Sequence, residues 1–199
     1  MTLLELFQTR RSLRRYTDER IPPDMIERLL TAAVWAPSAH NRQPWRFVVL
    51  TDAASKEQLA RVMGDNLRAD RLADGDPPEV IEQDTSRSFA RITSAPVVVV
   101  ACLTVAAMDQ YPDARRKKAE YLMAVQSVAM ALQNLLLAAH AEGLGACWMC
   151  APLFCQDVVR EALALPEDWE AQALITLGYP ANPGKPAMRR PVAEVLIHR

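Results

Sequence analysis

A dense basic segment near the N-terminus is the first feature of the chain that could do chemistry. Arg10, Arg11, Ser12 and Arg14 place three guanidinium groups and a hydroxyl directly after a short apolar stretch. Guanidinium groups form paired, charge-assisted hydrogen bonds with phosphate oxygens. The segment therefore favours a phosphate site, although such a run of charge is equally typical of a solvated surface.

A second polar segment, residues 37–45, reads Pro-Ser-Ala-His-Asn-Arg-Gln-Pro-Trp and joins a predicted helix to a predicted strand. The side chains of Asn41 and Gln43 can both donate and accept hydrogen bonds, which suits the polar edge of a heterocyclic ligand. An ordinary polar connection has the same composition. His40 could serve as a general acid near neutral pH, but we interpret it as structural or exposed.

The four cysteines do not indicate a metal centre. Cys102 lies in an apolar run, where a thiol packs as a small hydrophobic group. The spacing of Cys147 and Cys150 is typical of redox or zinc motifs, but no second pair or histidine cluster follows to complete four ligands. We expect reduced cysteines and no metal.

The composition limits the class of partner. With 199 residues, half of them hydrophobic, the chain can bury a core, and we expect one domain over residues 1–199. A formal net charge of -1 produces no field that would attract nucleic acid or an anionic membrane. The N-terminus lacks the pattern of a secretory signal. We expect a cytoplasmic protein with a small-molecule partner.

Predicted helices and strands alternate along the chain in a pattern typical of an α+β fold with a mixed central sheet wrapped by helices. Apolar spacing predicts five helices. They cover residues 3–9, a segment that begins at 22–23 and ends before 37, residues 55–63, a core helix over 121–139, and residues 154–163. Composition predicts strands over residues 45–50, 97–103, 146–149, 171–177 and 192–197. The charged segment 64–91 has weak periodicity and is expected to be an excursion that covers a pocket.

Three motifs follow one another along the chain. They are Arg-Arg-Ser-x-Arg at 10–14, Pro-Ser-x-x-Asn-x-Gln-Pro-Trp at 37–45 and Gly-Leu-Gly-x-Cys-Trp at 143–148. In this order they resemble the FMN-binding nitroreductase superfamily over essentially the whole chain, with 64–91 least covered. The resemblance implies a nitroreductase-like fold and a homodimer that holds FMN at its interface and swaps its C-terminal tail.

The resemblance also implies residues for each part of FMN. Arg10, Arg11 and Ser12 would contact the phosphate and ribityl chain, and Arg14 would stabilise the negative charge that reduction leaves at N1 and O2. From the partner subunit, the implied contacts are Pro37, Ser38, Ala39, Asn41 and Gln43. From the C-terminal half, they are the backbone at Met149 and Cys150 and the side chains of Lys185, Arg189 and Arg190.

The chain departs from many relatives after Met149, where Cys150 and Ala151 stand in place of two glycines, which weakens the implied backbone contact at flavin N5. This segment, with 165–169 and 177–180, is similar to a narrower branch. That branch is the flavin domain associated with the ligase that adds glutamates to the deazaflavin coenzyme factor 420. It implies reduction of the dehydro precursor of that coenzyme, and a general nitroreductase or quinone reductase is the alternative.

We therefore predict an FMN-dependent oxidoreductase with ping-pong kinetics. It would pass hydride equivalents from NAD(P)H or a deazaflavin to a nitroaromatic, a quinone or a conjugated C=C bond. Apart from Arg14 as an electrostatic stabiliser, no catalytic side chain is expected. No Gly-x-Gly-x-x-Gly fingerprint indicates a separate dinucleotide site. The competing hypothesis is a flavin-binding sensor or storage module without turnover.

Overall fold

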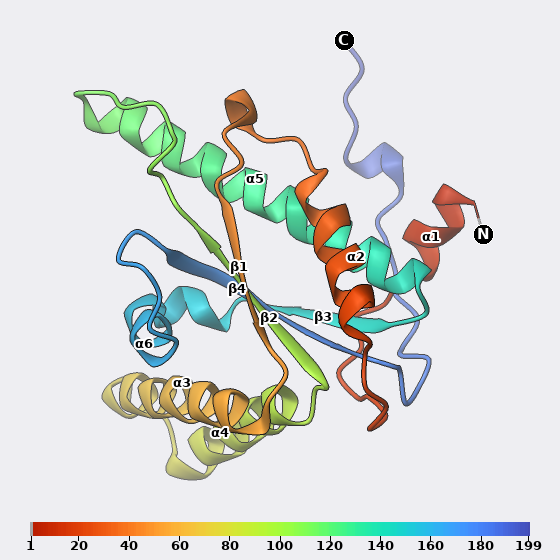
Figure 1. Cartoon of the computed structure of the whole chain (residues 1–199), viewed down its shortest axis with the longest axis vertical. Coiled ribbons are helices and arrows are strands. Elements are labelled where there is room, and N and C mark those ends of the chain that lie inside the picture. Colours follow the sequence, from red (N-terminus) through yellow and green to blue (C-terminus); the bar gives the residue numbers. More distant parts are fainter. Residues whose placement is uncertain (1) are drawn as a thin grey trace.

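The computed structural model describes residues 2–199, in which a four-stranded antiparallel sheet lies between two helical layers (Figure 1). The spatial order is β1-β2-β4-β3. The strands are β1 (Trp45–Leu50), β2 (Val97–Leu103), β3 (Gly145–Met149) and β4 (Glu170–Gly178). All pairs of these strands are antiparallel, and parallel pairing occurs at an isolated bridge between Ser12 and Ala146. The predicted fold class, α+β with a central sheet wrapped by helices, is confirmed, but the four strands pair only in antiparallel fashion where a mixed sheet was expected.

The helices cover both faces of the sheet. On one face lie α2 (Pro23–Val34) and α5 (Ala114–Ala141), and on the other lie α3 (Ala53–Ala73), α4 (Pro78–Thr93) and α6 (Gln156–Ala162). Successive side chains of a strand point to opposite faces. In β2, Val97 and Val99 therefore join the core under α5, whereas Val98 and Val100 join the core beside α3. Burial on both faces explains why this strand is continuously apolar.

Helix α5 is the predicted core helix, and it begins earlier than expected. The Asp113 carboxylate caps it by accepting a hydrogen bond from the Arg116 backbone N–H. By length and composition α5 could cross a membrane. Its buried stripe, which includes Val128, Leu132 and Leu135, packs against the sheet instead, as in the central helix of a protein core.

Segment 64–91, predicted as an excursion that covers a pocket, is almost entirely helical, which its weak periodicity did not indicate. It contains the second half of α3, a short turn at Gly75 with a φ of 82°, and most of α4. The two helices pack against each other as a hairpin. The apolar stripe of α4 is thin, with Ile81, Thr85 and Ile92 as its buried residues, so periodicity is a weak signal there.

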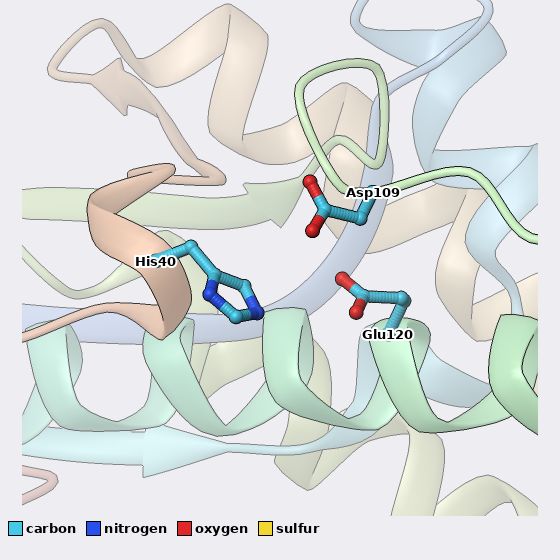
Figure 2. A group of neighbouring side chains, drawn as sticks. All are labelled: His40, Asp109 and Glu120. Atoms are coloured by element: carbon cyan, nitrogen blue, oxygen red, sulfur yellow. The ribbon is translucent and has the colours of Figure 1, made fainter.

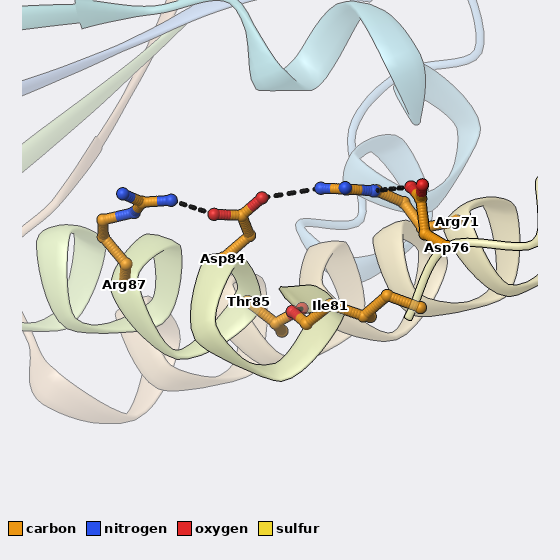
Figure 3. Close-up of polar contacts among 6 residues, drawn as sticks. All are labelled: Arg71, Asp76, Ile81, Asp84, Thr85 and Arg87. Atoms are coloured by element: carbon orange, nitrogen blue, oxygen red, sulfur yellow. Dashed lines mark hydrogen bonds and ion pairs between the residues drawn. The ribbon is translucent and has the colours of Figure 1, made fainter. Parts of the chain in front are cut away.

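Ion pairs across the turn stabilise this hairpin (Figure 3). The Arg71 guanidinium donates to Asp76 Oδ2 at 2.5 Å and to Asp84 Oδ2 at 2.6 Å. Asp84 also accepts a hydrogen bond from Arg87. The buried Thr85 hydroxyl is satisfied because it donates to the Ile81 carbonyl oxygen at 2.8 Å. Ion pairs therefore stabilise the α3–α4 hairpin, most of which the hydrophobic pattern does not predict.

The predicted terminal strand at 192–197, which would need an edge of its own sheet or of a partner's sheet, is not formed within this chain. The segment forms a 3₁₀ turn, η3 (Val192–Glu194), and then continues without a ladder partner among residues 2–199. Its apolar side chains are exposed, with Val192 at 69% and Ile197 at 80%. The other short elements are α1 (Leu3–Thr9), η1 (Ala39–Asn41) and η2 (Ala151–Phe154).

The N-terminal basic segment is aligned by backbone hydrogen bonds to the sheet and to the chain that leaves it. Leu13 N–H donates to the Ala146 carbonyl oxygen at 2.9 Å, and Thr17 N–H donates to Tyr179 at 2.9 Å. Ala181 N–H in turn donates to the Arg15 carbonyl oxygen at 3.1 Å. Leu13 is buried and Arg14 is exposed, the alternation expected of extended chain.

Tyr16 fastens this segment to β4. Its hydroxyl donates to the Leu13 carbonyl oxygen at 2.6 Å and lies 2.7 Å from the Thr176 hydroxyl. Burial raises the pKa of Tyr16, so the phenol stays protonated. The ring lies against Gly178, where a Cβ would approach Tyr16 carbon atoms to 2.7 Å and Pro96 Cδ to 2.8 Å. Close packing and a satisfied hydroxyl therefore hold residues 12–17 in place.

Replacing Tyr16 with Phe removes the hydroxyl and leaves buried groups at Leu13 and Thr176 without this partner. We expect the free energy of unfolding to fall by about 1–3 kcal/mol. Urea denaturation followed by circular dichroism measures the change. Tyr111→Phe is the matched control, because the Tyr111 ring contacts the Arg116 guanidinium face and its contact is kept. Equal stability of the two variants would contradict the role given to the Tyr16 hydroxyl.

Candidate functional site

A cavity of about 1140 Å³ lies where three segments that are distant in sequence meet. These are the N-terminal basic segment, the C-terminal half of α4 and residues 182–189 of the tail. Its cationic lining consists of Arg10, Arg11, Arg14, Arg15, Arg87, Arg91, Lys185 and Arg189. No carboxylate of residues 2–199 lines it. The cavity is therefore strongly electropositive.

Most of these cations lack a countercharge. Arg87 is paired with Asp84, but the other seven of the eight have no carboxylate at ion-pair distance within the described chain. Burial, Arg189 and Arg11 lower the pKa of Arg10, while burial, Arg14 and Arg87 lower the pKa of Arg91. Guanidinium groups nevertheless remain charged at neutral pH. Their mutual repulsion is relieved by an anion with several oxygens.

The tail reaches the cavity by passing close to the basic segment. Gly184 adopts a φ of 77°, and a Cβ there would lie 2.6 Å from Leu13 Cδ2. Its N–H donates to Asn182 Oδ1 at 3.1 Å, which closes a tight turn. Glycine at this position thus allows the tail to carry Lys185 and Arg189 into the same cavity as Arg10.

The structure brings together much of the site predicted from the sequence. Arg10, Arg11, Ser12, Arg14, Lys185 and Arg189 all line the cavity, whereas Arg190 is not among the lining residues. Sequence analysis missed Arg87 and Arg91. Their spacing of four residues places them on one face of α4, but that signal has meaning only once the segment is known to be helical.

The segment 37–43 does not line this cavity. It docks on α5, where Ala39 N–H donates to Ser127 Oγ at 3.2 Å. Asn41 and Gln43 are exposed, and Ser38 Oγ accepts a hydrogen bond from the Gln43 N–H at 3.0 Å. His40, Asn41 and Gln43 have φ values of 51°, 54° and 50°, a left-handed conformation that costs about 1 kcal/mol or more per residue. Pro37 precedes them and is exposed.

Strand β3, which contains Cys147, lies next to the N-terminal basic segment. Cys147 is buried, and desolvation raises the pKa of its thiol although Arg14 and Arg91 act in the opposite direction. Cys150 is exposed, and its Sγ accepts a hydrogen bond from the Trp148 indole N–H at 3.1 Å. All four cysteines are free thiols, and the predicted packing role of Cys102 is confirmed by its complete burial. Met149 and Cys150 do not line the cavity.

Comparison with known proteins gives relatives along nearly the full length. A protein of Methanothermobacter thermautotrophicus, provisionally named NADH dehydrogenase/NAD(P)H nitroreductase, is 33% identical over 187 residues, covering 92% of this chain and 81% of the relative. An NADH dehydrogenase of Thermus thermophilus is 30% identical, covering 96% and 92% of the two chains.

Solved structures share the fold. A nitroreductase of Desulfovibrio desulfuricans, provisionally so named and solved in complex with FMN, has a TM-score of 0.75 and 30% identity, covering 98% of this chain and 95% of that one. A BluB-like flavoprotein of Clostridium difficile has a TM-score of 0.79 and 25% identity, covering 100% and 99%. Residues 7–179 match the sequence model of the nitroreductase family. With its fold, its cavity and these relatives taken together, the chain belongs to the nitroreductase family.

Proposed function

We propose that this protein is an FMN-dependent oxidoreductase that passes hydride equivalents from a reduced nicotinamide nucleotide to a small organic acceptor. The observation that carries the proposal is the cavity with seven unneutralised cations. A phosphate ester fits that donor set, and the Desulfovibrio relative was solved with FMN. Bound FMN supplies a centre that accepts and releases hydride.

The phosphate contacts come from both ends of the chain. Arg10 and Arg11 offer guanidinium donors and Ser12 a hydroxyl, while Lys185 and Arg189 approach from the tail. Arg190 follows the lining residue Arg189, and we assign it a contact with the phosphate in the assembled protein. This set exceeds the charge of one phosphate, which leaves further cations for other parts of the ligand.

Arg14 and Arg91 are the cations assigned to the flavin ring. Both lower the pKa of the Cys147 thiol more strongly than Arg10 does, which supports placing them on the side of the cavity next to β3. Positive charge held there favours the electron-rich, reduced state of a flavin without any proton transfer by a side chain. Arg91 thus adds to the stabilising role that the sequence assigned to Arg14 alone. The backbone at Met149 and Cys150 is proposed to approach the ring from the end of β3.

A homodimer would complete each site. The exposed segment with Pro37, Ser38, Ala39, Asn41 and Gln43 is absent from the cavity of its own chain, and we assign it to the cavity of the partner subunit. Exposed apolar side chains support such an interface: Leu3, Leu4, Phe7, Trp35, Val192, Val195 and Ile197. The unpaired tail would then be swapped onto the partner.

The donor and acceptor are proposed to use one cavity in turn, which gives ping-pong kinetics. Relatives named NADH dehydrogenase or NAD(P)H nitroreductase support NADH or NADPH as the donor. The name nitroreductase supports a nitroaromatic acceptor, and we propose quinones beside it. The dehydro precursor of factor 420 is a narrower possibility, resting on the segments after Gly145.

Turnover is tested with the FMN-loaded protein under anaerobic conditions. We expect NADH or NADPH to bleach the flavin, and a quinone or nitroaromatic to restore the yellow colour, with parallel-line initial-rate plots. Reduced factor 420 as donor and its dehydro precursor as acceptor test the narrower branch, which fails if both are inert while quinones react. A flavin that stays oxidised with every donor would identify a binding module and not an enzyme.

The phosphate contacts are tested by comparing FMN with riboflavin. Arg10→Ala and Arg189→Ala each remove a charge-assisted contact, so we expect FMN affinity to fall about 10- to 100-fold while riboflavin affinity stays nearly constant. Fluorescence titration of the apoprotein measures both. Arg61→Ala on the exposed surface of α3 is the control. Equal losses for the two flavins would remove Arg10 and Arg189 from the phosphate site.

The swapped tail is tested by the double variant Val195→Asp with Ile197→Asp. We expect it to become monomeric and to lose FMN, because two buried carboxylates would oppose the interface. Size-exclusion chromatography with light scattering gives the mass, and absorbance gives the flavin content. Leu72→Asp, at an exposed leucine of α3, is the control. A variant that remains dimeric and yellow would contradict the swap, and a monomeric parent protein would contradict the dimer.

A further inference from the structure

Three potential metal ligands converge on α5, away from the basic cavity (Figure 2). His40 comes from η1, Asp109 from the loop between β2 and α5, and Glu120 from α5 itself. One ligand atom from each residue lies within 4.8 Å of the others. In Figure 2 the imidazole and both carboxylates point toward a common space. None of the three lines the basic cavity.

The unpartnered carboxylate of Glu120 is an independent observation that points to a bound ligand at this position. Its side chain is 5% exposed, and Oε2 has no hydrogen-bond partner among residues 2–199. An ionised carboxylate without a partner is strongly unfavourable inside a protein. No cation of the described chain forms an ion pair with Glu120, whereas Asp109 is paired with Arg42 at 2.5 Å. The unpaired oxygen is therefore available to a ligand of positive charge.

We propose that His40, Asp109 and Glu120 bind one divalent cation of the manganese or zinc class. An imidazole nitrogen with two carboxylate oxygens suits such a metal, whereas magnesium and calcium prefer oxygen ligands alone. Bonds of about 2.1 Å put ligand atoms about 3–3.5 Å apart, so ligand atoms that lie up to 4.8 Å apart must approach by as much as about 1.3–1.8 Å. The cation compensates the charge of Glu120 and shares Asp109 with the Arg42 guanidinium, and water fills the remaining positions.

The surroundings of the three ligands allow a metal to enter from solvent, and a bound metal would connect two elements of the fold. A cavity of about 550 Å³ is lined by both Asp109 and Glu120, which opens a path from solvent. The left-handed backbone of His40, with a φ of 51°, directs its ring toward α5. Bound metal would join η1 to α5 beside the existing hydrogen bond from Ala39 to Ser127. The metal site uses none of the residues assigned to flavin, but His40 stands between Ala39 and Asn41, so bound metal would also hold the segment that we assign to the partner subunit's cavity.

Mn²⁺ binding to the full-length, FMN-loaded and chelator-treated protein tests this site. Loss of the free Mn²⁺ signal in electron paramagnetic resonance gives stoichiometry and affinity, and the exposed Cys150 thiol is a poor ligand for this ion. We expect one ion per chain, displaced by Zn²⁺. His40→Gln and Glu120→Gln should each weaken binding at least about 10-fold. At 100 times its dissociation constant, Mn²⁺ should raise the melting temperature by about 5–10 °C.

Matched variants separate this site from weak surface binding. His198→Gln in the tail and Glu167→Gln, both at exposed positions, should bind Mn²⁺ like the parent protein. His40 is itself exposed, so His40→Gln decides the matter if Glu120→Gln fails to fold. Absence of binding to the parent protein, or binding unchanged in His40→Gln, overturns the proposal.

Discussion

The concentration of guanidinium groups around one cavity is the constraint on which the remaining structure depends. Like charges repel, so a chain that gathers them must hold each one by contacts that do not involve its charge. Here those contacts are backbone hydrogen bonds from Leu13 and Thr17, the Tyr16 hydroxyl, and the close approach of Gly184 to Leu13. The apolar side of the segment is buried, which leaves its cations facing the cavity.

The same constraint explains why the cavity draws on both ends of the chain. The N-terminal segment lies beside β3, the tail leaves β4 next to it, and α4 approaches from the opposite helical layer. Since β3 and β4 are neighbours in the sheet, residues near positions 12 and 184 become adjacent despite their separation in sequence. A ligand that binds here therefore contacts the N-terminal segment and the tail, which already lie against each other, together with α4.

The sequence was informative where burial and composition coincide. β2 has the predicted bounds because every residue is buried and its composition is uniformly apolar, and β1, which is half-buried over residues 46–49, also has the predicted bounds. Motif spacing located Arg10, Ser12 and Arg14 in one cavity with Lys185 and Arg189. Segment 64–91 was misjudged because helix α4 buries few apolar residues and depends on ion pairs, so Arg87 and Arg91 were missed with it. The strand predicted in the tail is absent from this chain because a strand depends on a hydrogen-bonding partner, which composition cannot reveal.

The position of Asp84 between two arginines makes the cavity wall sensitive to ionic strength. Asp84 joins Arg71 at the hairpin turn to Arg87 at the cavity, and all three side chains are partly exposed. Mobile ions screen such pairs over a Debye length of about 10 Å at 0.1 M salt. Added salt therefore acts twice: it weakens the attraction of the cavity for anions and loosens the hairpin that presents Arg87 and Arg91. Tolerance of a saline environment would thus depend on the ion pairs of α3 and α4 as well as on the phosphate contacts themselves.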